Sequence, residues 1–278
     1  MYNLLRGEFF KLKRNKSFRW CGFATVVMIV MIFATLELVG QIMQGTVENG
    51  TGGVTVTVMG NPVQEGEKLP LEEMGLPGII QQLFAGEYMM IVLAVFVGIF
   101  VAGEYSSGTL KNIIGKGYSR TKVYLSRFLV AAAAMVTLIL FGVAVCLACG
   151  LVFLGTGAFK GSFWGDFAVY IGLQLVMNIA LVAVFMLIDE VIRNMAGSIS
   201  GVLAIAIFAT LVVNGLDLLL VRLGVPVQLT DYCILDLSLG CPTEGLGAGA
   251  IGSILLISLL WLAAALGVGI WHFRQTDL

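Results

Sequence analysis

The residues that could carry out catalysis are few in this sequence, and they lie far apart. His272 is the only histidine, and it stands near the end of the last apolar stretch, where we interpret it as an interfacial residue. No His, Cys or Asp cluster has the spacing of a metal site, and no histidine can activate a serine or cysteine inside the apolar segments. The sequence therefore argues against an enzyme, and we expect no catalytic residue and no bound metal.

Two segments have a superficial likeness to parts of a nucleotide site. Ala183–Glu190 is an apolar run that ends in Asp-Glu, a pattern also found at strand ends in ATP-hydrolysing proteins. Gly115-Lys116 is a Gly-Lys pair, but neither the upstream glycine nor the Ser/Thr of a phosphate-binding loop accompanies it. We therefore expect that the chain neither hydrolyses ATP nor binds a cofactor itself, and we interpret Ala183–Glu190 as the end of a membrane helix.

Polar residues near the ends of apolar stretches are candidates for a substrate path. A carboxylate in a membrane costs free energy, so one that occurs there suggests function. Glu37, Glu87 and Asp217 stand in or near such ends. Glu87 is the strongest candidate, because Gln81 and Gln82 precede it and together they would form a polar vestibule.

Long apolar segments must position all of these residues. Hydrophobic residues make up 59% of the 278 residues and charged residues only 12%, against about 25% charged residues in soluble domains. Six stretches reach the roughly 20 residues that a membrane helix needs. They are about Trp20–Leu38, Leu83–Ala102, a span within Phe128–Leu154, Phe167–Ile188, Met195–Leu216 and Gly247–Ile270. The sequence predicts a single all-α membrane domain, residues 1–278, with six spans.

Basic residues are concentrated on one side of these spans. Of the 16 Lys and Arg residues, 13 fall before the first span, in the two loops on the same side, or in the tail. The positive-inside rule then places both termini in the cytoplasm, as an even number of spans also requires. A signal peptide is the alternative interpretation of the first segment, but no clear cleavage site follows it. The net charge of −1 provides no basic field for nucleic acid.

The segments between the spans differ in character. We expect residues 1–19 to form an amphipathic helix on the inner membrane surface, with Leu5, Phe9 and Leu12 on its apolar face; a basic flank that only sets topology is the alternative. In the inner loop 103–127, Ser107–Ile114 is predicted to form a short amphipathic helix that ends at Gly115 and Gly117. We expect residues 40–80 and 217–246 to form outer loops.

Two further patterns concern packing and covalent structure. The pairs Ala263/Gly267 and Ala265/Gly269 in the last span predict close helix packing, because small residues let helices approach. Cys233 and Cys241 lie in an outer loop, where a disulfide is permitted. Their spacing alone leaves paired and free thiols both open.

Four motifs carry a resemblance to a known family. They are Gly-Glu-Tyr-Ser-Ser-Gly-Thr-Leu-Lys-Asn at 103–112, Gly-Tyr-Ser-Arg at 117–120, Val-Tyr-Leu-Ser-Arg at 123–127, and the opening Leu-Leu-Arg-Gly-Glu-Phe-Phe-Lys-Leu-Lys at 4–13. Together with a basic surface helix before six spans, they resemble the permease subunits of ABC-2 type exporters. The similarity is strongest to the bacterial branch tied to lantibiotic and bacitracin self-immunity.

The resemblance implies a complex in the bacterial plasma membrane. Two permease subunits, alike or different, would pair with two separate ATP-binding cassette subunits, which hold ATP and Mg. The loop between the second and third spans would be the coupling helix that docks on the ATP-binding subunit. The residues of this chain that match the family's docking segment are Glu104, Gly108, Thr109, Lys111, Asn112 and Arg120.

The function implied by the resemblance is export of an amphiphilic substrate such as a peptide antibiotic. Acidic outer loops would favour cationic peptides by electrostatic steering. An ion-coupled secondary transporter is one alternative, but it would need charges facing the interior at mid-membrane, and the sequence shows none. A non-transporting membrane partner or sensor subunit is the other alternative.

Overall fold

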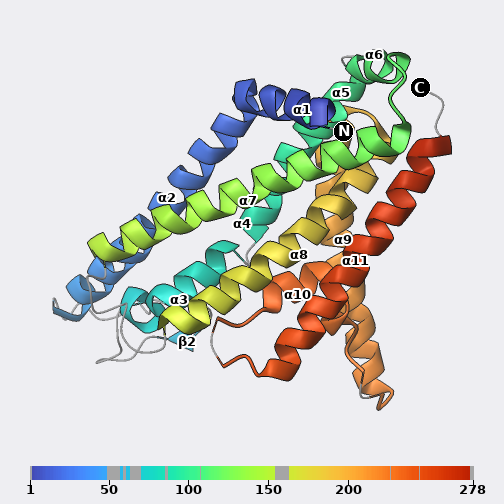
Figure 1. The fold of residues 1–278 in the computed structure, drawn as a ribbon. Coiled ribbons are helices and arrows are strands. Elements are labelled where there is room, and N and C mark those ends of the chain that lie inside the picture. The colour runs from blue at the N-terminus through green and yellow to red at the C-terminus, as the bar shows by residue number, and fades with distance from the viewer. Residues whose placement is uncertain are drawn as a thin grey trace.

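The computed structural model of the chain describes residues 2–48, 57–58, 61–62, 70–84, 87–106, 108–153, 163–225, 227–243 and 245–275. Almost all of these residues are helical (Figure 1). In chain order the elements are α1 (Tyr2–Arg14), α2 (Lys16–Glu48), β1 (Thr57–Val58), β2 (Asn61–Pro62), α3 (Pro70–Phe84), α4 (Glu87–Val97), the π-helical turn η1 (Gly98–Ala102), α5 (Gly103–Ser106), α6 (Thr109–Gly115), α7 (Arg120–Phe153), α8 (Phe163–Ile192), α9 (Met195–Arg222), the 3-10 turn η3 (Leu229–Asp231), α10 (Ile234–Gly240) and α11 (Ala248–Gln275).

Five helices are long and apolar enough to cross a membrane. They are the first part of α2 (Lys16–Val39), then α7, α8, α9 and α11. The chain is therefore an all-helical, multi-pass membrane protein, as its composition predicts. A shorter apolar stretch, Met89–Tyr105, runs through α4, η1 and α5.

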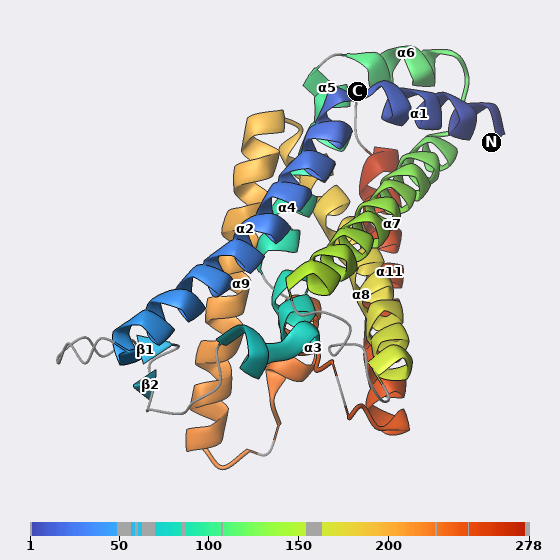
Figure 2. The same cartoon turned by 90° about the vertical axis from the view of Figure 1, so that its left-hand side faces the viewer.

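Helix α8 is the centre of the bundle. It packs against α7, α11, α9 and η1, and 61% of the residues in its most apolar window are buried, compared with 11% in α9. Figure 2 shows α9 apart from α7, α8 and α11, with α2 crossing in front of it. Only Arg193 and Asn194 separate α8 from α9, so the turn between the two helices is tight. Arg193 adopts a positive φ of 55° there, and Asn194 caps α9 by accepting a hydrogen bond from the Ala196 amide.

The second predicted span, Leu83–Ala102, is not one regular helix. α3 ends at Phe84, α4 begins at Glu87, and the last turn before α5 is π-helical. A side chain that inserts into the helical ladder is a known cause of such a change. Here the Val101 carbonyl, within the π-helical turn, accepts a hydrogen bond from Arg127 Nη2 at 2.8 Å.

The predicted surface helix 1–19 is shorter than expected, and a different face of it is buried. α1 ends at Arg14, and residues 16–19 already belong to α2. Its buried face is made by Leu4, Glu8 and Leu12, whereas Phe9 is 46% exposed. The apolar pattern alone misplaces this face, because a carboxylate, Glu8, lies in its middle. Figures 1 and 2 show α1 lying across one end of the bundle, where it packs on α7.

The predicted outer loops 40–80 and 217–246 contain helices. α3 occupies the end of the first loop and buries Leu76, Ile79 and Ile80, whose helical spacing outweighs the nearby prolines. α10 lies within the second loop and buries Ile234 and Ser238. Both segments pack on α8 and so belong to the core of the protein.

Close packing of α11 depends on Gly269, as the small-residue pair Ala265/Gly269 predicts. A Cβ at Gly269 would stand 2.7 Å from Cζ of Tyr124, whose ring is fully buried in α7. Gly267, two residues earlier, has no atom within 4 Å of such a Cβ. The contact therefore belongs to one face of α11.

We expect Gly269→Ala to lower the free energy of unfolding by about 1–3 kcal/mol, because the buried Tyr124 ring has no room to move. Gly267→Ala is the matched control and should leave it unchanged or raise it by up to about 1 kcal/mol, because alanine is the better helix former. Both are read from thermal unfolding of the detergent-solubilised protein. Equal melting temperatures for the two variants would show that α11 does not pack on α7 in this way.

Candidate functional site

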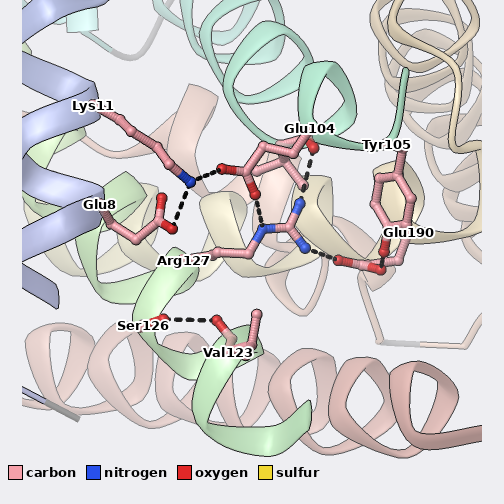
Figure 3. Close-up of polar contacts among 9 residues, drawn as sticks. Glu8, Lys11, Glu104, Tyr105, Val123, Ser126, Arg127 and Glu190 are labelled. Atoms are coloured by element: carbon pink, nitrogen blue, oxygen red, sulfur yellow. Dashed lines mark hydrogen bonds and ion pairs between the residues drawn. The ribbon is translucent and has the colours of Figure 1, made fainter. Parts of the chain in front are cut away.

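Arg127, in the second turn of α7, is the centre of a buried polar cluster. Its side chain is fully buried, and its guanidinium contacts three other segments (Figure 3). Nε lies 2.9 Å from Oε2 of Glu104 in α5, Nη1 lies 2.9 Å from Oε1 of Glu190 in α8, and Nη2 donates to the Val101 carbonyl of η1. An arginine stays charged in a protein, so these partners are what make its burial tolerable.

Glu104 connects this cluster to the N-terminal helix. Its second carboxylate oxygen, Oε1, lies 2.9 Å from Nζ of Lys11 in α1. Lys11 also pairs with Glu8, one turn earlier in α1, at 2.9 Å. A chain of ion pairs therefore runs from α1 through α5 to α7 and α8, as Figure 3 shows.

The charges at the α1 end of the chain are not balanced. Burial, and then the carboxylate of Glu104, raise the pKa of the Glu8 carboxyl above its ordinary value, although Lys11 and Arg127 act in the opposite sense. For Lys11, burial alone would lower the pKa, but Glu104 and Glu8 outweigh it and raise the pKa. Lys11 therefore stays protonated at neutral pH, whereas the surroundings of Glu8 disfavour its charged form.

Glu190 completes the cluster from α8. It is 1% exposed, and its other carboxylate oxygen accepts a hydrogen bond from the Tyr105 hydroxyl. The Arg127 guanidinium lies 5.4 Å from the centre of the Tyr105 ring, a cation–π distance. The neighbouring Asp189 is fully buried as well. The Asp-Glu pair at the end of Ala183–Glu190 therefore lies near the end of a helix, but both side chains are buried inside the protein.

This arrangement holds four helices together. It joins α1, α5, α7 and α8 through buried ion pairs, and separating one partner from another would leave an unpaired charge in the apolar interior, at a high cost in free energy. In the described part of the chain, no group of three or more His, Cys, Asp or Glu side chains is placed to hold a metal ion. The candidate functional site is therefore a junction between helices.

The loop that follows Glu104 forms a short helix, as predicted. α6 runs from Thr109 to Gly115, and Gly108 precedes it with a φ of 64° that favours glycine. Leu110 is buried and anchors the helix, while Lys116 beyond its end is exposed. Lys111 and Asn112 belong to α6, but their side chains lie outside the described residues.

Arg120, the last of the residues that match the docking segment, begins α7 and contacts the end of α11. Its Nη1 donates to the carbonyls of Phe273 (3.5 Å) and Arg274 (3.2 Å) at the end of α11. The Nε of Arg274 donates in return to the Thr121 hydroxyl. A cation that binds the last carbonyls of a helix stabilises its C-terminus. Arg120 thus has a structural partner within the chain.

The candidate substrate path is only partly described. Gln82 lies in α3 and Glu87 begins α4, but their side chains lie outside the described residues. Gln81 donates to the Cys241 carbonyl at 3.2 Å and so ties α3 to the end of α10. Asp217 accepts hydrogen bonds from the Leu229 and Thr230 amides, which makes it an anchor for the loop after α9.

The disulfide between Cys233 and Cys241 is not formed. Both thiols are free, and the two residues flank the two ends of α10. A helical rise of 1.5 Å per residue separates their Cα atoms by about 12 Å, well beyond the roughly 7 Å that a disulfide allows. Burial raises the pKa of the Cys241 thiol to about 11, so it stays protonated.

Sequence reasoning found Glu104 but missed its partners. The sequence marked Arg127 only as a basic residue of the inner loop that ends the motif at 123–127, and Glu8 only as a residue of the motif at 4–13. One signal was available: Arg127 directly precedes an uncharged run, and Asp189-Glu190 directly ends another. Charges at such positions face either the headgroups or one another.

Residues 62–278 match a protein family described as "Protein of unknown function (DUF2705)". The match covers more than half of the chain, so the chain belongs to this family. No curated protein matches it. Glu104, Tyr105, Arg127 and Glu190 of the cluster lie in the matched region, whereas Glu8 and Lys11 of α1 precede it.

We expect Arg127→Met to lower the free energy of unfolding by about 3–5 kcal/mol, because it leaves Glu104 and Glu190 buried without their cation. Lys122→Met, an exposed position on the same helix, is the control and should change it by no more than about 0.5 kcal/mol. Both are measured by unfolding in detergent. Similar small losses in both variants would mean that the buried pairs do not stabilise the fold.

The docking of α1 should depend on pH through Glu8. Because the folded pKa of Glu8 is raised, docking takes up a proton: it is strongest below the ordinary pKa of 4.5 and weakens as pH rises through the raised value. Spin labels at the exposed positions Lys13 and Lys122 would report this as a broader distance distribution at higher pH. Glu8→Gln should remove the dependence, and an unchanged dependence in that variant would assign it to another group.

Proposed function

We propose that this member of the DUF2705 family is the membrane-spanning permease subunit of an ATP-driven exporter. In this proposal the segment from Glu104 through α6 docks on a separate ATP-binding subunit, and a second permease subunit completes the complex. The observation that supports it most is the buried ion-pair cluster, which ties the base of α6 to two long apolar helices. Residues 103–112 resemble the docking segment of ABC-2 permeases, so this connection would link the docking site to the membrane helices.

A count of six crossings follows if α4, η1 and α5 cross together. The helical run Glu87–Ser106 is about 30 Å long at 1.5 Å per residue, the thickness of a bilayer core. Six crossings place both termini on one side, in agreement with Figure 1, where both ends lie near α6. The excess of basic residues assigns that side to the cytoplasm. The membrane would be the bacterial plasma membrane.

The cluster gives a route for mechanical coupling. α6 is held to α5 by a single described turn residue, Gly108, and α5 continues directly from η1. A push on α6 would therefore reach η1 through the backbone, and it would reach α7 and α8 through the contacts of Arg127. Rigid transmission of this kind is how packed elements convert a local movement into a larger one.

Transport driven by ATP on a partner fits better than transport driven by ions. An ion-coupled carrier needs charged groups near the middle of the membrane. In the middle of α8, the buried polar residues Gln174 and Asn178 are uncharged amides that bond to each other. Among the described residues, the fully buried charges Arg127, Asp189 and Glu190 lie instead at helix ends near α6.

The substrate in this proposal is an amphiphilic molecule such as a peptide antibiotic. A protein with this much exposed apolar surface on its long helices can accept such a molecule from the bilayer itself. The acidic outer segment, with residues such as Glu65 and Glu67, would attract a cationic peptide. The chain carries no catalytic role here, since ATP and Mg belong to the partner.

We expect the tagged chain, extracted in detergent from its native membrane, to co-purify with a stoichiometric ATP-binding subunit. Reordering residues 108–112 should abolish this association, because Gly108 and the first turn of α6 form the docking surface. The measurement is identification of the co-eluting proteins after size-exclusion chromatography.

The matched control reorders residues 223–227, at the far end of α9 in Figure 1. It should leave the association intact. Both variants must elute at the same volume as the unmodified chain, which shows that loss of the partner is not caused by unfolding. A folded, unmodified chain that brings down no ATPase would contradict the permease assignment.

A further inference from the structure

A basic and aromatic hollow lies on the outward face of α2, next to the junction with α1. It encloses about 400 Å³ and is lined by Lys16, Arg19, Trp20 and Phe23. All four side chains are exposed, Trp20 by 67% and Phe23 by 60%. Rings this exposed are normally covered by something in the working protein.

The four residues form one stripe of the helix. Their spacing of three, four and seven places them on a single face, while Cys21, Thr25, Ile29 and Phe33 make the buried face that packs on α7, α3 and α4. The outward stripe continues with exposed apolar residues, namely Val27, Val30 and Met31. From Trp20 to Met31 the helix rises by about 16 Å, half of a bilayer core of roughly 30 Å.

Along its length, the stripe matches the successive parts of a phospholipid molecule, from the charged headgroup to the acyl chains. Two cations stand first, and then the rings of Trp20 and Phe23, 5.8 Å apart in an edge-to-face arrangement. Aliphatic side chains follow over the depth of one leaflet. Aromatic rings favour the level just below the headgroups, and Lys and Arg favour anionic lipid. No carboxylate lines the hollow to oppose a phosphate.

We propose that Lys16, Arg19, Trp20 and Phe23 bind one anionic phospholipid. Lys16 and Arg19 hold its headgroup phosphate, and one acyl chain lies along Trp20 and Phe23 toward Met31. The apolar continuation into the span suits an acyl chain better than a water-soluble protein. This site fixes the end of α2 where the chain turns into α1, and so it fixes the helix that carries Glu8 and Lys11. It does not depend on the proposed transport function.

The test places the full chain in phosphatidylcholine nanodiscs that contain a small fraction of brominated phosphatidylglycerol or brominated phosphatidylcholine. Bromine quenches nearby tryptophan, and the part due to Trp20 is the difference between the chain and Trp20→Phe. Each basic residue near the headgroups strengthens binding of anionic lipid about fivefold, so two predict a preference for phosphatidylglycerol of roughly 25-fold. Equal quenching by the two lipids would by itself overturn the proposal, before any basic residue is replaced.

Two variants with the same net charge locate the site. Lys16→Gln with Arg19→Gln should bring the preference down to near unity, whereas Lys13→Gln with Arg14→Gln should keep most of it. An equal loss in both would indicate a general surface attraction and overturn a defined site. Displacement of the lipid by inorganic phosphate at constant ionic strength, or quenching blocked by a second protein chain at Trp20, would overturn the lipid as its occupant.

Discussion

The burial of one charge, that of Arg127, constrains most of this structure. A guanidinium cannot shed its proton to enter an apolar interior, so its buried charge needs anionic or polar partners. Those partners come from α5, from α8 and from the carbonyl of Val101 in η1. The π-helical turn, Glu104 and Glu190 are therefore held around a single buried charge.

The cluster has more acid than base, and α1 is where the imbalance is met. Glu104 already faces Arg127, and Lys11 brings a second cation to it from α1. Lys11 in turn pairs with Glu8, whose charged carboxylate is disfavoured by burial and by Glu104. α1 is thus more than a basic flank that sets topology, because it covers the open end of the cluster. A lipid bound where α1 meets α2 would help to hold α1 in this position from the membrane side.

Much of this architecture could be predicted from the sequence, and the parts that could not share a cause. Long apolar runs gave the membrane helices, and glycines at 115 and 117 predicted where α6 ends. The helices in the supposed outer loops were missed because prolines suggested breaks, although Leu76, Ile79 and Ile80 have helical spacing. The roles of Arg127, Glu190 and Arg120 depend on partners that lie 23 to 154 positions away in the sequence. Local pattern holds no information about such partners, so a buried arginine and a topological arginine look alike in sequence.

The most direct test of this account is the coupling energy between Glu104 and Arg127. It is obtained from the unfolding free energies of the unmodified chain, Glu104→Gln, Arg127→Met and the double variant, with the chain in detergent. If the buried pair joins α5 to α7, the double variant should be more stable than the sum of the single losses predicts, by about 0.5–3 kcal/mol. Additive losses would mean that the pair does not act as a unit, and that α6 is not tied to the membrane helices through Arg127.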